Sequence, residues 1–299
     1  MKGRALAAVA LLLAVPQAMM AQAADACEIA VATDPDARKL LAAAAFAQAD
    51  EAMVDNLIAC LGDPDPAIRD DGAFALWSEG LRGGHLSPAL MRHAMQRLSA
   101  LLAAPDDAAG FRKPFAALAL SEVARADRIA AFLTDVERHA LAQLSATYMR
   151  GITDHRGFVA GEGWRHGVAH GADLMLQLAL NPRLARADVD PMLAALGVQI
   201  APADHHHYHQ GEAGRLARPI LFLAKRADID DAAWAAWFRT LHPDAAPRWQ
   251  APYGSDEKLA AVHNSTAFAQ AIYVAASESQ DPQVRRLAPL AVGLIEALP

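Results

Sequence analysis

The sequence predicts an all-α protein built from stacked helical hairpins. Alanine and leucine, which are good helix formers, are abundant in a chain that is 54% hydrophobic. β-branched residues are sparse and aromatic residues make up only 6% of the chain, so few segments favour a strand. Apolar residues recur with helical spacing between short polar turns, and no segment has an alternating pattern worth assigning to a strand.

Turn residues divide this pattern into individual helices. Ser87 is a good N-cap because Pro88 then takes the first helical position. The pair Asn181-Pro182 ends a helix that begins near Trp164, since a residue before proline disfavours the helical conformation. The other predicted helices lie at 36–61 with a break near 50, after the turn at 64–66, at 88–104, 111–126, 128–150 and 188–200, from 211, and at 231–241, 256–277 and 281–297, with a connecting loop at 242–255.

A short pattern occurs twice, near the two ends of the chain. Asp65-Pro66-Ala67-Ile68-Arg69 opens one helix and Asp281-Pro282-Gln283-Val284-Arg285 opens another. Such a turn resembles that of HEAT-type helical repeats, which stack into an α–α superhelix, or α-solenoid. The resemblance implies that the arginine is structural and bonds across neighbouring turns. Trp234, Trp237 and Phe238, in a later helix, are predicted to belong to the core.

The first 23 residues have the features of a secretory signal peptide. Lys2 and Arg4 precede an apolar run at 5–15 that is too short to cross a bilayer comfortably. The sequence Ala21-Gln22-Ala23 fits a small-x-small cleavage site. We therefore predict a mature chain, 24–299, that forms a single all-helical domain in the periplasm or outside the cell. No later segment has the apolar length of a transmembrane helix, so no membrane span is expected.

The charge of the chain argues against nucleic acid as a partner. The formal net charge is −7, and loss of Lys2 and Arg4 with the leader makes it −9. No dense run of lysine or arginine is present, whereas nucleic acids and anionic membranes require a basic surface. The expected partner is therefore a protein or a small molecule.

Cys27 and Cys60 are the two cysteines of the chain, and both remain after removal of the leader. In an oxidising compartment this favours a disulfide, which adds about 3 kcal/mol of stability. The bond would attach the mature N-terminus to the first helical hairpin. The alternative is two separate thiols, with Cys60 buried in a helix.

Residues 154–180 combine glycine, histidine and charge more densely than any other segment. Glycines mark a loop, and helical spacing begins at Trp164. At about 100° per residue, His166, His170 and Asp173 fall within roughly 60° of one another, with Trp164 on the opposite, apolar side. A narrow polar stripe on a mostly apolar helix predicts that these side chains face an internal groove or a ligand.

A second unusual segment, 205–209, holds four histidines. Neutral imidazoles bind transition metals. Consecutive residues cannot all face one ion, so this tract would supply two ligands at most, His207 or His209 among them. Taken alone, the tract reads as a polar loop.

Four segments give the chain a resemblance to a bacterial family known as domain of unknown function 2785. The most specific is Gly163-Trp164-x-His166-x-x-Ala169-His170-x-Ala172-Asp173. The looser ones are Gly-Asp-Pro-Asp-Pro-x-Ile-Arg-Asp at 62–70, Asp-x-Arg-Gly-Phe-Val at 154–159 and Glu-x-x-Arg-Leu-Ala at 212–217. The resemblance covers most of the mature chain. It implies an all-helical, HEAT-like fold and no particular activity, and it does not imply the leader or the histidine tract.

Several reaction classes lack their sequence patterns. A glycine-rich phosphate loop followed by lysine is missing, and so is the Gly-x-Ser-x-Gly turn of many serine hydrolases. Cys–His chemistry is excluded if the two cysteines pair. Two classes of function remain.

In the first, an exported helical repeat protein binds a protein partner or a small ligand in a polar groove. Asp154 and Arg156 would either contact that ligand or brace the loop as an ion pair. The complete set of groove residues is Asp154, Arg156, Trp164, His166, His170, Asp173, Glu212 and Arg215.

The alternative is a metal-dependent hydrolase or metal-binding protein. His166, His170 and Asp173 would hold a divalent metal such as zinc, and Glu212 would act as general base on a bound water. In the usual helix-borne metalloprotease pattern a glutamate directly follows the first histidine. Gly167 occupies that position here, so the base must come from elsewhere.

Overall fold

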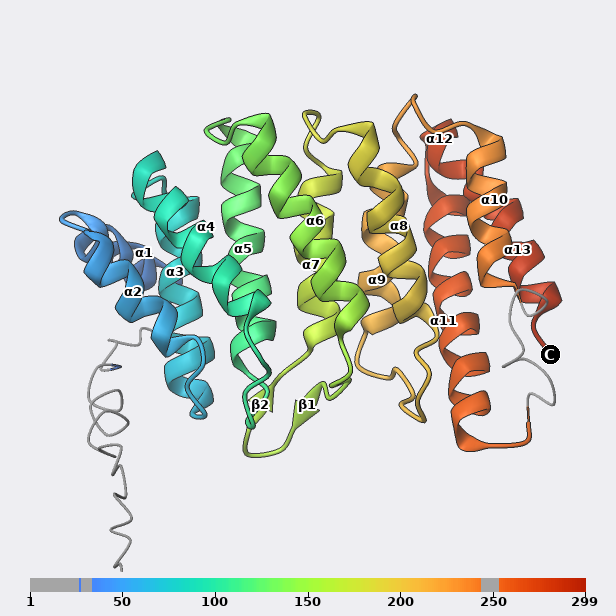
Figure 1. Ribbon diagram of the computed structural model, residues 1–299, viewed down its shortest axis with the longest axis horizontal. Coiled ribbons are helices and arrows are strands. Elements are labelled where there is room, and N and C mark those ends of the chain that lie inside the picture. Colours follow the sequence, from blue (N-terminus) through green and yellow to red (C-terminus); the bar gives the residue numbers. More distant parts are fainter. Residues whose placement is uncertain (1–26, 28–33, 243–252) are drawn as a thin grey trace, which may run out of the picture.

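The computed structural model describes residue 27 and residues 34–242 and 253–299. This part of the chain is helical apart from one two-stranded sheet (Figure 1). The helices are α1 (Pro35–Phe46), α2 (Glu51–Cys60), η2 (Ala67–Phe74), α3 (Ala75–Arg82), α4 (Pro88–Ala103), α5 (Arg112–Ile129), α6 (Asp135–Gly151), α7 (Gly167–Ala179), α8 (Arg186–Ile200), α9 (Glu212–Leu223), α10 (Asp231–Leu241), α11 (Asp256–Glu278), α12 (Pro282–Arg285) and α13 (Leu287–Ala297). The predicted all-α class is therefore confirmed.

The small sheet is an addition that the sequence pattern did not predict. Strand β1 (Phe158–Val159) pairs antiparallel with β2 (Gly163–Trp164), with Phe158 opposite Trp164. Each strand has only two residues, which is too short for the period-2 alternation that marks a strand in a sequence.

The helices form two rows along the length of the molecule (Figure 1). Odd-numbered helices pack against one another in the order α1, α3, α5, α7, α9, α11 and α13, and α2, α4, α6, α8 and α10 form the second row. Successive helices run in opposite directions, so their connections gather at two opposite edges. We term the lower one in Figure 1, which carries residues 62–66, 104–111, 152–166 and 201–211, the loop edge.

A continuous hydrophobic core fills the space between the rows, and Trp234, Trp237 and Phe238 belong to it as predicted. Tryptophan N–H groups also tie neighbouring helices together. The indole of Trp77 donates to a backbone oxygen of α5, and that of Trp237 to a backbone oxygen of α8, each at 3.0 Å. Such a bond satisfies a buried indole N–H, which is costly to leave unpaired, whereas the N–H of the buried Trp234 indole has no hydrogen-bond partner.

Side-chain caps set many helix starts. Ser87 accepts a hydrogen bond from the N–H of Leu90 at 3.3 Å, with Pro88 as the first residue of α4, as predicted. The predicted break near residue 50 is also confirmed, because the Asp50 carboxylate caps α2.

The break between α5 and α6 differs from the predicted one at 127. Helix α5 continues to Ile129, and α6 begins only at Asp135. Thr134 and Glu137 form a capping box that fixes the start of α6. The Asp127 carboxylate accepts hydrogen bonds from the backbone N–H groups of Phe132 and Leu133, and these bonds shape the connection between α5 and α6.

Helix α7 begins later than its apolar spacing suggested. Its first residue is Gly167, His166 is the N-cap residue, and Trp164 lies in β2. The backbone N–H groups of Arg165 and His166 donate to the carbonyls of Gly157 and Arg156, each at 3.0 Å, which folds the chain back before the helix starts. The prediction that Trp164 lies on the apolar side of this helix is therefore wrong.

The arginine of the first Asp-Pro turn is structural, as predicted. Arg69 is fully buried in η2, a π-helical segment, and donates to the carbonyl oxygens of Asp63 at 2.8 Å and Pro64 at 3.2 Å. It also reaches the carbonyl oxygen of Glu162 at 3.0 Å, far away in the sequence. Arg69 thus links the first hairpins to the β1–β2 segment.

At the second copy of the turn, the neighbouring residue takes this role. Arg285 is exposed. Arg286 donates to the carbonyls of Ala224 at 3.0 Å and Ile229 at 2.8 Å and pairs with Asp231 at 2.9 Å. The prediction for Arg285 is therefore wrong, because α12 ends at this residue and turns Arg286 toward the preceding connection.

Cys27 and Cys60 form a disulfide, as predicted. The predicted leader at 1–23 lies outside the described residues, and so do residues 243–252 of the predicted connecting loop. Among the helices of the described ranges, none combines the length and apolar character needed to cross a bilayer.

Candidate functional site

The loop edge brings His166 and Glu212 together from different parts of the sequence. Their Nε2 and Oε1 atoms are 3.4 Å apart, without the geometry of a hydrogen bond. Both side chains are more than nine-tenths buried, and each of these two atoms lacks a hydrogen-bond partner. Unpaired buried polar atoms are uncommon in folded proteins because each costs about 1–3 kcal/mol. This pair is the centre of the candidate site.

Glu212 is ionised in this position. It is the first residue of α9, where the helix dipole favours a negative charge, and its Oε2 accepts the N–H of Gln210 at 2.9 Å. Burial acts to raise the pKa of Glu212, but His166 and the backbone N–H groups outweigh burial and hold this pKa below its usual range. The carboxylate therefore accepts hydrogen bonds and donates none.

His170 lies one helical turn deeper than His166. Its ring centroid is 5.9 Å from that of His166 and 5.3 Å from that of Phe115. Burial, helped by the nearby charges of His166 and Arg215, lowers the pKa of His170 to about 3. The ring is therefore neutral at physiological pH, and its buried Nδ1 has no hydrogen-bond partner.

Asp173 pairs with Arg215 rather than with the histidines. This ion pair joins α7 to α9, and burial raises the pKa of Asp173 although Arg215 opposes the shift. Within the described ranges, no three side chains of His, Cys, Asp or Glu are arranged to hold a metal ion. The predicted ligand set of His166, His170 and Asp173 does not assemble, because Arg215 occupies the carboxylate.

Asp154 and Arg156 brace the loop that leads to β1. The guanidinium of Arg156 donates to both carboxylate oxygens of Asp154, at 2.8 and 2.5 Å. Burial acts to raise the pKa of Asp154, but the bonds from Arg156 outweigh burial and lower this pKa. A side chain at Gly110 would approach the Asp154 carboxylate to 2.6 Å, so the loop at 104–111 passes close by.

The hairpin places the ring of Trp164 on His166 and the ring of Phe158 beside Trp164. Trp164 stacks on His166, with centroids 4.8 Å apart and 24° between the planes. The ring of Phe158 lies 5.3 Å from that of Trp164, and these two residues are 48% and 38% exposed, respectively. Trp164 therefore covers His166 on one side and meets solvent elsewhere.

A glutamine fixes this hairpin to the start of α9. The side chain of Gln210 accepts the N–H of Phe158 at 2.7 Å and donates to its carbonyl at 3.3 Å. A Cβ atom at Gly157 would lie 1.6 Å from Oε1 of Gln210, so a larger residue there would displace the Gln210 amide. The hairpin and Glu212 are thus positioned by the same short segment.

A line of stacked side chains, which sequence reasoning missed, supports the site from within. The guanidinium carbons of Arg69 and Arg165 lie 3.9 and 4.2 Å from the centroid of the Phe111 ring, too close to share one face. Arg69 also lies over Phe115, at 4.9 Å. The aromatic–cation stack consists of Arg165, Phe111, Arg69, Phe115, His170, His166 and Trp164. The sequence analysis singled out Arg69, Trp164, His166 and His170 of this stack but not Phe111, Phe115 or Arg165, and Arg165 lies inside the Gly163–Asp173 motif.

The histidine tract is held as an ordered loop by Asn264 of α11. The side chain of Asn264 accepts the N–H of Tyr208 at 2.8 Å and donates to the carbonyl of His206 at 2.9 Å. The ring of His207 lies beside that of His263, and Nδ1 of His209 is 2.8 Å from the His207 carbonyl. The interpretation as a polar loop fits these contacts.

His155, which sequence reasoning did not select, anchors the start of this loop. It is buried, with Nδ1 2.5 Å from an Asp204 oxygen and Nε2 3.0 Å from Oε1 of Gln199. The single histidine at 155 carried no periodic signal, because its partners come from α8 and from the loop after it.

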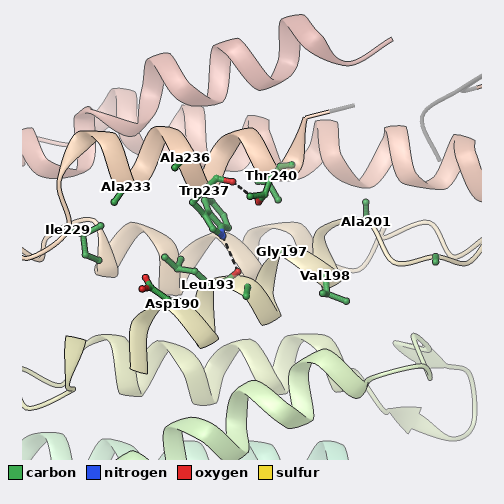
Figure 2. A pocket seen from close by; sticks show the side chains of 13 residues that line it. Asp190, Leu193, Gly197, Val198, Ala201, Ile229, Ala233, Ala236, Trp237 and Thr240 are labelled. Atoms are coloured by element: carbon green, nitrogen blue, oxygen red, sulfur yellow. Dashed lines mark hydrogen bonds between the residues drawn. The ribbon is translucent and has the colours of Figure 1, made fainter. Parts of the chain in front are cut away.

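Two of the cavities in the described part of the chain lie between helices of the second row. The larger, of 610 Å³, lies between α8 and α10, with Trp237 across it (Figure 2). Its polar side chains are already bonded, Asp190 to Arg186 and Thr240 to the carbonyl of Trp237. The smaller, of 430 Å³, adjoins the loop edge and includes Asp154 and Gly167 in its lining. Neither cavity is lined by His166 or Glu212.

Comparison with known proteins gives one match. A family model described as "Protein of unknown function (DUF2785)" matches residues 98–274. The matched segment contains Asp154, Arg215 and every candidate residue between them, whereas the turn at 62–70 lies outside it. The searches of curated proteins and of solved structures return no match.

Proposed function

This chain belongs to the DUF2785 family, and from the geometry of its loop edge we propose that it is an exported helical repeat protein that binds a protein partner or a small ligand there. The binding site comprises the half-buried ion pairs Asp154–Arg156 and Asp173–Arg215 around His166 and Glu212, beneath Trp164. His170 forms the inner wall of this site.

One observation carries this proposal. Nε2 of His166, Oε1 of Glu212 and Nδ1 of His170 are buried polar atoms without hydrogen-bond partners, and the three side chains are neighbours, with the first two atoms 3.4 Å apart. A ligand that bonds to them offsets a cost that the folded chain otherwise bears. Half-exposed aromatic rings at the rim add the apolar contact area typical of binding sites.

The proposed architecture is a HEAT-like α-solenoid in which residues 24–299 form one domain. The order of packing within each row, and arginines that bond from one hairpin to the connection of another, support it. In repeat proteins of this kind each unit contacts mainly its neighbours. A site shared by α7 and α9 therefore lies between adjacent units.

Export rests on the leader pattern at 1–23 and agrees with the disulfide, since disulfides persist in oxidising compartments. Expression of the full chain in a bacterial host, followed by intact mass measurement of the periplasmic fraction, tests this. A chain that begins at Ala24 supports export, and a full-length chain retained in the cytosol contradicts it.

Thermal unfolding tests the binding site. The mature chain without a histidine tag is heated with neutral oligosaccharides, short peptides or nucleotides in separate series. A bound ligand at a hundredfold excess over its dissociation constant stabilises by about 2.7 kcal/mol. We expect one series to raise the melting temperature of the wild type and not that of Glu212→Gln. Equal shifts in both proteins, or no shift in any series, would contradict the proposal.

Glu122→Gln is the matched control. Glu122 is also a buried carboxylate, but it pairs with Arg82, away from the loop edge. Its removal affects stability without touching the site, so the ligand-induced shift persists in this variant. The same samples, analysed for bound metal by mass spectrometry, test the metal-dependent alternative.

A further inference from the structure

The cavity of 430 Å³ at the loop edge has room for a small molecule. Its walls come from α4, α5, α6, α7 and the loop edge. Thr147 and Gly151 of its lining are exposed, whereas Leu102 and Tyr148 are buried. The cavity therefore has both an opening to solvent and an interior, and its volume falls in the range of small-molecule sites, about 300–1,000 Å³.

One side of this cavity is apolar. Leu102 of α4, Leu144 of α6, Ile152 after α6 and Pro114 of α5 belong to its lining. Apolar surface gains free energy when it leaves water, so this side suits the hydrocarbon part of a ligand.

The other side carries the carboxylates of Asp106, Asp107 and Asp154. Two of them converge on Gly110: Oδ2 of Asp107 accepts its N–H at 2.9 Å, and a Cβ atom there would lie 2.6 Å from Oδ2 of Asp154. Among the described residues that line the cavity, Lys113 is the one cation, and its ammonium group is 2.8 Å from Asp106. The lining therefore has more negative than positive charge, and it already accommodates one ammonium group.

The carboxylates keep the capacity to accept further hydrogen bonds, since a carboxylate has about four lone-pair positions. Asp154 accepts three bonds, all from Arg156, and Asp107 accepts three from backbone N–H groups. Arg156 is not among the residues that line the cavity. This side therefore favours a ligand group that donates several hydrogen bonds and carries positive charge.

Tyr148 adds a buried hydroxyl to the lining and is 9% exposed. Its oxygen is 3.4 Å from the carbonyl oxygen of Gly167, whereas a hydroxyl usually bonds at about 2.7–2.8 Å. Burial and the charges of Asp106 and Asp154 raise the pKa of Tyr148, so the hydroxyl is neutral and its surroundings have a negative potential. A Cβ atom at Gly167 would lie 3.3 Å from this hydroxyl and 3.7 Å from the carbonyl oxygen of Asp154, so two acceptors surround one point.

We propose that this cavity binds a small protonated amine, with the ammonium group among Asp107, Asp154 and Tyr148 and the hydrocarbon part between α4 and α6. An ammonium group has three donors and no acceptor, which matches a side that is rich in acceptors. This site goes beyond the proposed function. It shares Asp154 with the binding site described above, but neither His166 nor Glu212 lines the cavity.

Three probes with the same phenylethyl body and different head groups test the charge of the ligand: 2-phenylethylamine, 2-phenylethanol and 3-phenylpropanoate. The untagged mature chain is titrated with each by calorimetry at pH 7, where a primary amine is protonated, as lysine is. We expect the amine to bind at least about tenfold more tightly than the alcohol, and the carboxylate to bind most weakly. Equal affinity for the amine and the alcohol, tighter binding of the carboxylate, or no binding of the amine overturns the proposal.

Two variants locate the amine in this cavity. The methyl group of Gly167→Ala occupies the point between the Tyr148 hydroxyl and the Asp154 carbonyl, so it should weaken amine binding at least about tenfold. Tyr148→Phe removes only the hydroxyl and should weaken it roughly two- to tenfold. Circular dichroism confirms that each variant is folded.

Gly197→Ala is the matched control. It adds the same methyl group to the larger cavity, where the Cβ atom would lie 3.5 Å from Leu241, and it should leave the amine affinity unchanged. Weaker amine binding in Gly197→Ala, with wild-type binding in Gly167→Ala, overturns the assignment to the smaller cavity.

Glu212→Gln separates this inference from the proposed function. It should keep the amine affinity of the wild type, because Glu212 lies outside the cavity. Loss of amine binding in this variant overturns the amine site. If the amine does not bind, and another ligand stabilises the wild type but not Glu212→Gln, the amine site is wrong and the proposed function stands.

Discussion

The imidazole of His170 shows how strongly the surroundings of one side chain can fix its charge. The ring packs edge-on against Phe115 and beside His166, and Arg215 and Arg69 oppose a proton on it. In the unfolded chain this histidine takes up a proton near its ordinary pKa of 6.5, but in the folded chain only near 3. Between these values the unfolded state binds more protons, so the stability that depends on neutral His170 is lost as the pH falls.

Replacement of His170 should change how the stability of the protein depends on pH in the acid range. In His170→Gln the free energy of unfolding falls less steeply between pH 6.5 and pH 4 than in the wild type. The difference in the free energy of unfolding over this range is about 3 kcal/mol, since each pKa unit corresponds to about 1.36 kcal/mol. Urea unfolding at a series of pH values measures it. His85→Gln, at an exposed histidine, is the control and keeps the wild-type slope; the same slope in His170→Gln would refute the assignment.

At the scale of single residues, the sequence predicted residues that the fold places close together, but not the partners that they contact. His166, His170, Asp173 and Glu212 were selected because helical spacing and residue type are visible in the chain. The Asp173–Arg215 pair, and the stack of Arg69 and Arg165 on Phe111, depend on how separate helices pack. No local pattern in the sequence encodes that packing. The sequence therefore predicted Asp173 as a metal ligand, whereas in the structure it forms an ion pair with Arg215.

Arginines at helix ends join successive elements across the edge opposite the loop edge. Arg226, after α9, donates to the carbonyl of Leu184, and Arg286, after α12, donates to those of Ala224 and Ile229. Ala224 follows the last residue of α9, where carbonyls have no partner inside the helix, and Leu184 and Ile229 lie in the connections before α8 and α10, so a guanidinium from a neighbouring element satisfies each of them. These bonds fix the angle at which one hairpin follows another.

The adjacent pair Arg285 and Arg286 tests this role directly. Arg286→Ala leaves two buried carbonyls without a donor and should lower the free energy of unfolding by about 1–3 kcal/mol. Arg285→Ala removes an exposed side chain and should change it by less than about 0.5 kcal/mol. Chemical denaturation of both variants gives the comparison. If both variants lowered the free energy of unfolding equally, the hydrogen bonds of Arg286 would not be the cause of the destabilisation.

At the scale of elements, local signals predicted the helices well and their limits less well. Proline, N-cap residues and apolar spacing act within a few residues, so α4 and α10 were predicted almost to the residue. The start of α7 was misplaced because Trp164 continues the helical spacing, whereas backbone bonds to Arg156 and Gly157 hold the chain extended there. Those bonds form because the chain folds back on itself at this point, and the spacing of apolar residues does not reveal such a reversal.

The molecule as a whole is extended, and its first hairpin lies at one end of both rows (Figure 1). A terminal unit has a neighbour on one side only, so it gains less from packing than an internal unit. The disulfide joins Cys27 to the end of α2, across 33 positions of sequence, and ties this unit down. Covalent attachment compensates for the missing neighbour.

Removal of this bond should therefore destabilise the chain from its N-terminal end. A loop of this length corresponds to roughly 3–4 kcal/mol, so reduction with dithiothreitol should lower the melting temperature by at least about 6 °C. Hydrogen exchange should quicken first in α1 and α2. The Cys27→Ser, Cys60→Ser double variant is the control and should not respond to the reductant. A reduced wild type that melts at the oxidised temperature would contradict this.

His166 adopts a left-handed backbone conformation, with φ of 54° and ψ of 40°, and among the described residues no other non-glycine has a positive φ. An ordinary side chain there costs about 1 kcal/mol relative to glycine, which adopts the same angles freely. A chain selected only for stability would therefore have glycine at position 166. His166→Gly should relax the main chain while it removes the imidazole, so tolerance to heat and capacity to recognise a ligand should move in opposite directions at this one residue.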